Sequence, residues 1–205
     1  MSFVEHLRNV HGYNEPIYVQ ELQYENYSRP WIFKELQRLV ANSDIKRFSA
    51  GVYYFPQKTP FGDSCLDPQK IVERRFLSDG KDVYGYIAGV SLLNLAGLST
   101  QVPNVLELVT NNETTRVRDL NIGTQRIRAR RSRTPITAEN VYVLQFLELM
   151  NAITPETLDE TERYMLSKYT KTSGVTRNAV SLYANLFPAR AMKNMVTSGI
   201  VYELA

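Results

Sequence analysis

The sequence has one cysteine, two histidines and no long apolar run, and each shortage excludes a class of protein. Cys65 has no partner for an internal disulfide, and His6 and His11 are too few to complete a zinc site with it. The most apolar stretch, residues 86–98, is interrupted by small and polar residues and is shorter than the roughly 20 residues of a membrane-spanning helix. We therefore expect no disulfide, no metal site and no membrane span.

Signals for secretion and for common catalytic sites are also missing. Charged residues occupy positions 5 and 8, where a secretory signal would have its apolar segment, so we expect a cytoplasmic protein. The chain has no phosphate-binding Gly-x-x-x-x-Gly-Lys-Ser/Thr loop, no Gly-x-Gly-x-x-Gly and no His-Glu-x-x-His. We expect neither enzymatic activity nor a cofactor.

Positive charge is concentrated in residues 116–133, which hold seven arginines and a single acid, Asp119. The excess in this segment is larger than the net charge of +3 on the whole chain. Such a segment favours an anionic partner, which could be DNA, RNA or an acidic protein, although a solvated sheet face is the alternative. The arginines are Arg116, Arg118, Arg126, Arg128, Arg130, Arg131 and Arg133.

The same segment has the alternation of a β-strand over residues 122–131. Successive side chains of a strand point to opposite faces, so Arg126, Arg128 and Arg130 are expected on one face and Ile127 and Ala129 on the other.

The N-terminal region begins with helix signals. Ser2 and Glu5 form a capping box before an apolar stripe, and Gly12 ends that helix. Residues 17–19 are expected to form a short strand and residues 20–24 a brief helix. Ser28 is a good N-cap for a third helix over residues 28–41, whose apolar residues recur at helical spacing.

A β-hairpin is expected next, with strands at residues 45–49 and 52–55 around a turn at Gly51. Helix, short strand, helix, turn, helix and hairpin is the order of a winged helix-turn-helix, which we assign to residues 1–58. In that fold the third helix enters the DNA major groove and the hairpin is the wing. The predicted DNA-binding residues are Ser28, Arg29, Trp31, Lys34, Arg38, Lys46 and Arg47. The alternative is that Lys34 and Arg38 are ordinary solvated helix residues and that Trp31 is buried against a neighbour.

The remainder of the chain is predicted to be a Pro- and Gly-containing linker, residues 59–68, and a small α+β domain, residues 69–205, with a helical tail. The fold class is therefore α+β throughout. Its expected strands cover residues 105–110 and 122–131; its expected helices cover residues 69–77, 87–95, 137–150, 155–169, 176–186 and 188–196.

Several short motifs occur in the order found in a known family. They are Leu-Gln-Arg-Leu-Val at 36–40, Ile-Lys-Arg-Phe at 45–48, Gly-Val-Tyr-Tyr at 51–54 and Pro-Gln-Lys-Thr-Pro-Phe-Gly at 56–62. Further along are Ser-Thr-Gln-Val-Pro-Asn-Val at 99–105, Thr-Asn at 110–111 and Arg-Ser-Arg-Thr-Pro-Ile-Thr-Ala-Glu-Asn at 131–140. Over roughly residues 30–150 the chain resembles AbiEi-type antitoxins of type IV toxin-antitoxin systems.

That resemblance implies a winged helix-turn-helix that binds inverted repeats in double-stranded DNA of its own promoter. It also implies a C-terminal domain that counters a nucleotidyltransferase-type toxin from a neighbouring gene, with or without direct contact, in a monomer or a homodimer. The implied promoter contacts are Arg29, Lys34, Arg38, Lys46 and Arg47, and the arginine-rich strand would serve toxin neutralisation or a second DNA contact.

Ser43 stands where relatives usually carry glycine, and we expect Asn42 to take the left-handed backbone conformation instead.

Two other functions remain open at this point. The chain could be a stand-alone winged-helix transcriptional regulator without a toxin partner, which the identity of the adjacent gene would distinguish. It could also be an RNA- or protein-binding module that uses the arginine-rich strand, in which case RNA binding would show a steep salt dependence and no promoter preference.

Overall fold

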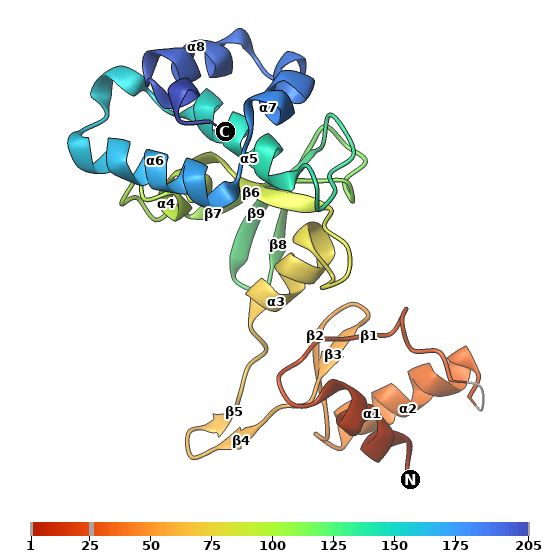
Figure 1. The fold of residues 1–205 in the computed structure, drawn as a ribbon. Helices are drawn as coiled ribbons and strands as arrows, with labels where there is room; N and C mark the ends of the chain where they lie inside the picture. Colours follow the sequence, from red (N-terminus) through yellow and green to blue (C-terminus); the bar gives the residue numbers. More distant parts are fainter. Residues whose placement is uncertain (1, 25–26, 205) are drawn as a thin grey trace. The chain divides into compact units, whose positions relative to one another are not determined.

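A computed structural model describes residues 2–24 and 27–204. The chain divides into two compact units, residues 1–71 and 72–205, and each has its own hydrophobic core. Figure 1 shows a mixture of helices and strands in both units, so the described chain is mixed α/β.

The N-terminal unit begins with the expected capped helix, α1 (Phe3–His11). The Ser2 hydroxyl accepts a hydrogen bond from the backbone N–H of Glu5 at 3.3 Å, and Glu5 Oε2 accepts one from the backbone N–H of Ser2 at 2.8 Å. A three-stranded antiparallel sheet in the order β1-β3-β2 follows from β1 (Ile17–Tyr18), β2 (Lys46–Ser49) and β3 (Val52–Tyr54). The hairpin prediction is thereby confirmed.

The long helix α2 (Arg29–Ala41) is also confirmed, with Ser28 as its N-cap. Ile32, Leu36 and Leu39 are buried in the core that α2 shares with α1 and the sheet. The expectation for Asn42 is wrong: Asn42 keeps a right-handed φ of −80°, and Ser43 takes the left-handed φ of +63°.

Ser43 takes that conformation because α2 ends in a Schellman motif. The backbone N–H of Ser43 donates to the carbonyl of Val40 at 3.0 Å, and that of Asp44 donates to the carbonyl of Leu39 at 2.9 Å. This pattern places the left-handed residue one position beyond Asn42.

The brief helix expected at residues 20–24 is wrong. Residues 19–21 form a turn, in which Glu21 N–H bonds the Tyr18 carbonyl at 3.0 Å and Leu22 N–H bonds the Val19 carbonyl at 3.3 Å. Val19 and Leu22 anchor this turn in the core, and two apolar anchors are too few for a full helical stripe. Residues 25–26, which follow, lie outside the described part of the chain.

The segment expected to be a linker carries a small ribbon of two strands, β4 (Lys58–Thr59) and β5 (Gly62–Asp63). The Ser64 hydroxyl donates to Asn14, and Lys70 Nζ donates to the Asn14 carbonyl at 3.1 Å and pairs with Glu15. These bonds attach the segment to the N-terminal unit. The helix expected next is confirmed as α3 (Pro68–Val72) followed by one π-helical turn, η1 (Glu73–Leu77).

The C-terminal unit contains a four-stranded sheet in the order β6-β7-β9-β8, in which β7 and β9 are parallel and the other pairs antiparallel. Its strands are β6 (Gly85–Ala88), β7 (Val105–Thr110), β8 (Val117–Ile122) and β9 (Gln125–Arg131). The strand predicted at 105–110 is confirmed. The strand predicted at 122–131 starts three residues later, because Ile122 belongs to β8 and pairs with Gln125 across a tight turn.

Helices cover both faces of this sheet. On one face Tyr86 and Val109 pack against Val141 and Leu144 of α5 (Val141–Ala152). On the other face η1 contacts β6 and β7, and the carbonyl of Phe76 approaches Gly85 so closely that an added Cβ would lie 1.8 Å from it. A side chain at position 85 is therefore sterically excluded.

The remaining helices surround α5, which is buried on nearly all sides. Most of the predicted helices are present with shifted ends; α5 begins at Val141 rather than at Thr137, because residues 138–140 form a turn. The helix predicted over residues 155–169 is instead divided into a 3-10 turn at residues 155–157 and an α-helix that starts at Glu160, after its N-cap Asp159. The elements are α4 (Gly89–Leu95), η2 (Pro155–Thr157), α6 (Glu160–Ser173), α7 (Arg177–Tyr183), η3 (Ala184–Leu186), α8 (Ala189–Thr197) and η4 (Ile200–Tyr202).

Candidate nucleic-acid interface

The exposed face of α2 carries two cations one helical turn apart. Lys34 and Arg38 are both exposed and lie opposite the buried stripe of Ile32, Leu36 and Leu39. Gln37 is exposed on the same face; it was absent from the sequence prediction because an uncharged side chain gives no charge signal. Lysine, glutamine and arginine can together contact phosphates and base edges.

Arg38 is held by an acid of its own helix. Its Nε lies 2.9 Å from Glu35 Oε2 and one of its amino groups 2.5 Å from Glu35 Oε1. The Arg38 guanidinium lowers the pKa of Glu35, and the carboxylate in turn raises the pKa of Arg38. By contrast, Arg29 and Lys34 have no ion pair with any residue that the structure describes.

Ser28 and Trp31, two of the predicted contact residues, stabilise the start of α2. The Ser28 hydroxyl accepts a hydrogen bond from the backbone N–H of Trp31 at 3.4 Å, which caps α2. The Trp31 ring stacks on Tyr27 with centroids 4.1 Å apart and meets Phe3 edge-on at 5.2 Å. Trp31 is nevertheless 37% exposed, so part of its ring faces solvent.

The hairpin carries the other two predicted contacts. Lys46 Nζ lies 3.1 Å from Asp63 Oδ2, and this hydrogen-bonded pair raises the pKa of Lys46. Arg47 is exposed, and its Nε donates to the carbonyl of Ser49 at 3.3 Å, next to the irregularity in the β2–β3 register. Arg47 therefore extends along the hairpin rather than into the core.

In the C-terminal unit, the alternation predicted for the arginine-rich strand is confirmed. Ile127 and Ala129 are buried, whereas Arg126 and Arg128 are exposed on the opposite face. Arg128 pairs with Asp119 of β8, with Nε 2.8 Å from Oδ1 and an amino group 3.2 Å from Oδ2. The pairing lowers the pKa of Asp119 and raises that of Arg128.

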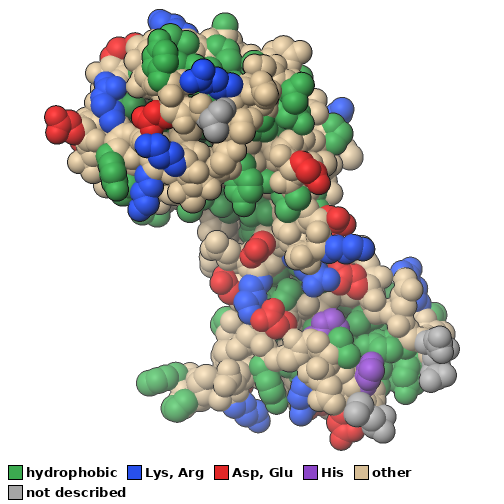
Figure 2. Space-filling view, viewed as in Figure 1, with side chains coloured by type: hydrophobic (Ala, Val, Ile, Leu, Met, Phe, Trp, Pro, Cys, Tyr) green, Lys and Arg blue, Asp and Glu red, His purple; other side chains and the backbone are tan. Residues whose placement is uncertain are grey.

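The seven arginines of residues 116–133 do not form one surface. Arg118 lies opposite Ala129 in the β8–β9 register, and so, like Arg131, it belongs to the face away from Arg126 and Arg128. Arg116 lies beside Arg131, whose backbone N–H donates to its carbonyl at 3.3 Å. On the visible face of the C-terminal unit, at the top of Figure 2, basic and acidic side chains are interspersed.

Arg130 and Arg133 contact the helical part of the C-terminal unit instead of solvent alone. Arg130 lies 2.5 Å from Glu148 of α5, and both side chains are largely withdrawn from solvent. One amino group of Arg133 donates to the carbonyl of Leu186, and its guanidinium lies 5.8 Å from the centre of the Phe187 ring. Arg126 and Arg128 are thus the two members of the predicted strand surface that share an outward face.

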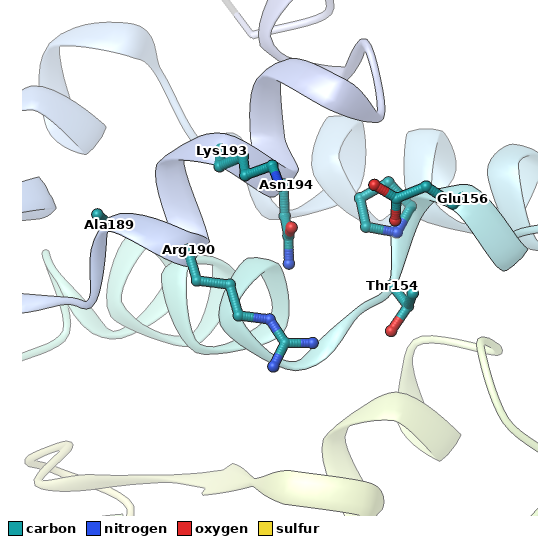
Figure 3. A pocket seen from close by; sticks show the side chains of 7 residues that line it. Thr154, Glu156, Ala189, Arg190, Lys193 and Asn194 are labelled. Atoms are coloured by element: carbon teal, nitrogen blue, oxygen red, sulfur yellow. The ribbon is translucent and has the colours of Figure 1, made fainter.

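A separate cavity of about 470 Å³ lies beside the end of α5 and is lined by Thr154, Glu156, Arg190, Lys193 and Asn194 among others. Figure 3 shows Arg190 and Asn194 reaching from α8 toward the turn that follows α5. The buried amide of Asn194 donates to the carbonyls of Met150 at 2.9 Å and Ile153 at 2.8 Å. Asn194 thus satisfies two backbone carbonyls at the C-terminal end of α5, which accounts for its buried position.

Within residues 2–24 and 27–204, no group of three or more His, Cys, Asp or Glu is placed to hold a metal ion. Cys65 is exposed and free. In the same ranges, no helix combines the length and the apolar character needed to cross a membrane.

Comparison of the sequence with protein-family models and with curated proteins gives no match.

Proposed function

We propose that this chain is a DNA-binding antitoxin of the type IV class that represses transcription from its own promoter. The observation that carries the DNA-binding part is the exposed face of α2, where Lys34, Gln37 and Arg38 stand opposite the buried stripe. The β2–β3 hairpin, with Lys46 and Arg47, follows α2 in the order of a wing. The antitoxin part rests on the sequence resemblance described above.

The charges of the N-terminal unit support DNA contacts from both α2 and the β2–β3 hairpin. Lys34 and Arg29 are cations without an intramolecular ion pair in the described chain, so they can meet phosphates without first losing a partner. Arg38 is paired with Glu35 and Lys46 with Asp63, so an acid already neutralises part of the charge that each would offer to DNA. Exposed pairs of this kind contribute little to stability, so a ligand with many phosphates can displace the acids.

The test is binding of the purified protein to its own upstream DNA, compared with an unrelated fragment of equal length over a range of salt concentrations. We expect a preference of at least about a hundredfold for the upstream fragment. Replacing Lys34 and Arg38 by alanine should abolish that preference and reduce the salt slope by about two.

The matched control is Lys168→Ala with Arg177→Ala, which removes the same charge from exposed positions on α6 and α7. Unchanged operator binding by a folded Lys34→Ala, Arg38→Ala protein would refute the assignment of α2 as the recognition helix.

Antitoxin activity needs a separate experiment, namely growth of cells that express the product of the adjacent gene with and without this chain. Rescue of growth would support the antitoxin part. Promoter binding without rescue would leave a stand-alone regulator.

A second candidate function is favoured by Arg126, which is exposed and has no ion pair among the described residues. Together with Arg128 it could contact the backbone of RNA. This function predicts tight binding to RNA without a promoter preference and a smaller salt slope in an Arg126→Ala protein.

A further inference from the structure

The exposed face of α2 carries a large apolar side chain among its cations. Phe33 is 47% exposed and directly precedes Lys34, and Gln37 lies one helical turn beyond it. The hydrophobic core of the N-terminal unit, as far as the described residues define it, includes Val40 of the same helix as a partly buried member but does not include Phe33. Phe33 is therefore not needed to pack α2 onto its own unit.

Trp31, the other large aromatic residue exposed on α2, has partners within the fold. Its ring stacks on Tyr27 and meets Phe3 edge-on. Among the residues that the structure describes, Phe33 has no ring contact of this kind. The solvent-facing part of Phe33 is thus an apolar surface that a binding partner can cover.

A single exposed apolar residue is ordinary on a protein surface, so the neighbours of Phe33 decide what it means. Gln37 follows it by four residues, and side chains at that spacing are neighbours on the surface of a helix. Lys34 and Arg38 stand beside this pair, and Glu35, the acid of α2, is engaged by Arg38. This face suits a partner that offers negative charge, hydrogen-bonding groups and an apolar group at close range.

The major groove of DNA offers these three features together. Thymine presents its C5 methyl group there, which phenylalanine can contact, and adenine presents N7 and its N6 amino group, which the amide of glutamine can contact in a bidentate pair. Residues four apart are separated by about 6 Å along a helix, and stacked base pairs are separated by roughly 3.4 Å. Phe33 and Gln37 can therefore reach bases of the same or of neighbouring pairs.

We propose that α2 reads A·T base pairs in its DNA site, with Phe33 in contact with a thymine methyl group and Gln37 in contact with an adenine. The inference rests on the DNA-binding function proposed above and adds the bases that are read. Lys34 and Arg38 bring positive charge beside these two side chains, which strengthens binding to the same stretch of DNA.

The first experiment removes the methyl groups from the DNA. The upstream fragment is prepared with uracil in place of thymine, a change of the C5 substituent alone, and both forms are titrated with the full-length protein by fluorescence anisotropy at constant salt. The wild-type protein should bind the uracil form about fourfold more weakly for each methyl group contacted, which is the effect of losing one buried apolar carbon.

Two variants at position 33 assign that difference to its side chain. Phe33→Ala should bind the thymine and uracil forms equally, because the contact that distinguishes them is gone, whereas Phe33→Leu should keep part of the difference. The matched control is Phe61→Ala, which removes a fully exposed ring from the turn between β4 and β5 of the same unit. This control should keep the whole preference for thymine.

The outcomes separate this inference from the function on which it rests. Equal binding of the two forms by a wild-type protein that still prefers its upstream fragment would overturn the inference and leave DNA binding intact. An undiminished thymine preference in a folded Phe33→Ala protein would also overturn it, as would a preference that Phe61→Ala abolishes. Equal binding of upstream and unrelated DNA by the wild-type protein would refute the proposed function and this inference with it.

A second pair of fragments tests Gln37. Replacing adenine by 7-deazaadenine removes the N7 acceptor, and the wild-type protein should bind this form at least about fivefold more weakly, the lower end of the discrimination that one bidentate contact supplies. Gln37→Ala should bind both forms equally, and the control Gln20→Ala, at another exposed position of the same unit, should retain the difference. An equal loss of affinity in the wild type and in Gln37→Ala would overturn the assignment of adenine to Gln37.

Discussion

Ser43 adopts a backbone conformation that costs free energy for any residue with a side chain. Its φ of +63° is required by the Schellman motif that ends α2 and starts the path to the hairpin. L-residues lose roughly 1–2 kcal/mol in this region, whereas glycine enters it freely.

We therefore predict that Ser43→Gly stabilises the N-terminal unit by about 0.5–1 kcal/mol, after the entropic cost of glycine in the unfolded chain. The measurement is urea unfolding followed by the fluorescence of Trp31. The control is Asn42→Gly, at a right-handed φ of −80°, which should destabilise the same unit. A lower unfolding midpoint in Ser43→Gly than in the wild type would contradict the strain assigned to Ser43.

Glu35 is the residue that competes with DNA for Arg38. Its pKa is lowered by Arg38, so it remains ionised at neutral pH and occupies the guanidinium. Glu35→Gln should increase affinity for DNA by a few-fold, since it frees Arg38 and removes a negative charge from the face of α2. Fluorescence anisotropy with labelled upstream DNA at constant salt measures the change.

The control for that experiment is Glu160→Gln at an exposed position of α6, which removes the same charge from the C-terminal unit. Weaker DNA binding by Glu35→Gln than by the wild type would show that the ion pair positions Arg38 rather than competing for it.

At the scale of elements, the contact between β6 and η1 depends on one glycine. A Cβ on Gly85 would lie 1.8 Å from the Phe76 carbonyl oxygen and 2.9 Å from the Val109 carbonyl oxygen. Both atoms are backbone, so neither can move by a side-chain rotation. Gly85→Ala should destabilise the C-terminal unit by about 3 kcal/mol or more.

Thermal unfolding followed by circular dichroism measures this effect, with Ile87→Val on the same strand as a control that should cost about 1 kcal/mol. Equal unfolding midpoints for Gly85→Ala and Ile87→Val would contradict the close packing of η1 on β6.

The elements that could be predicted are those whose own residues carry a regular apolar pattern, in the helices together with capping residues at the ends. Capping residues and apolar stripes predicted α1 and α2, and strict alternation predicted the faces of β9. β8 escaped prediction because its mixture of arginine, aspartate and asparagine resembles a loop. β6 escaped because its four residues run directly into α4, so the sequence pattern predicts one helix over residues 87–95.

The candidate site was less predictable than the fold, for a physical reason. Charge counting found all seven arginines but could not show that Arg130 meets Glu148, 18 positions away, or that Arg133 meets Leu186, 53 positions away. Contacts of this kind are fixed by tertiary packing of α5 and η3 near the sheet, and no local pattern encodes them.

At the scale of the whole molecule, two separate cores imply two separable unfolding events. The core of residues 1–71 joins α1, α2 and the β1-β3-β2 sheet, and the larger core of residues 72–205 surrounds α5. Single-transition unfolding is expected of one cooperative domain, so we predict two transitions here. The first should belong to the N-terminal unit, because a smaller unit buries a smaller fraction of its surface.

Trp31 allows a direct measurement, since it is the one tryptophan of the chain and lies in the N-terminal unit. Its fluorescence should change at a lower urea concentration than the far-ultraviolet circular dichroism of the whole chain. Coincidence of the two curves would show that the chain unfolds as one cooperative body.

The position of β8 at one end of the sheet has a consequence for solubility. An outer strand offers a row of backbone N–H and C=O groups to any other strand, which is how folded proteins begin to aggregate. Arg118 lies within this strand, and Arg116 and Arg131 lie beside it. Asp119 of the same strand is paired with Arg128, so Arg116 and Arg118 are the charges that two copies approaching edge to edge would bring together, and we expect their repulsion to oppose such pairing.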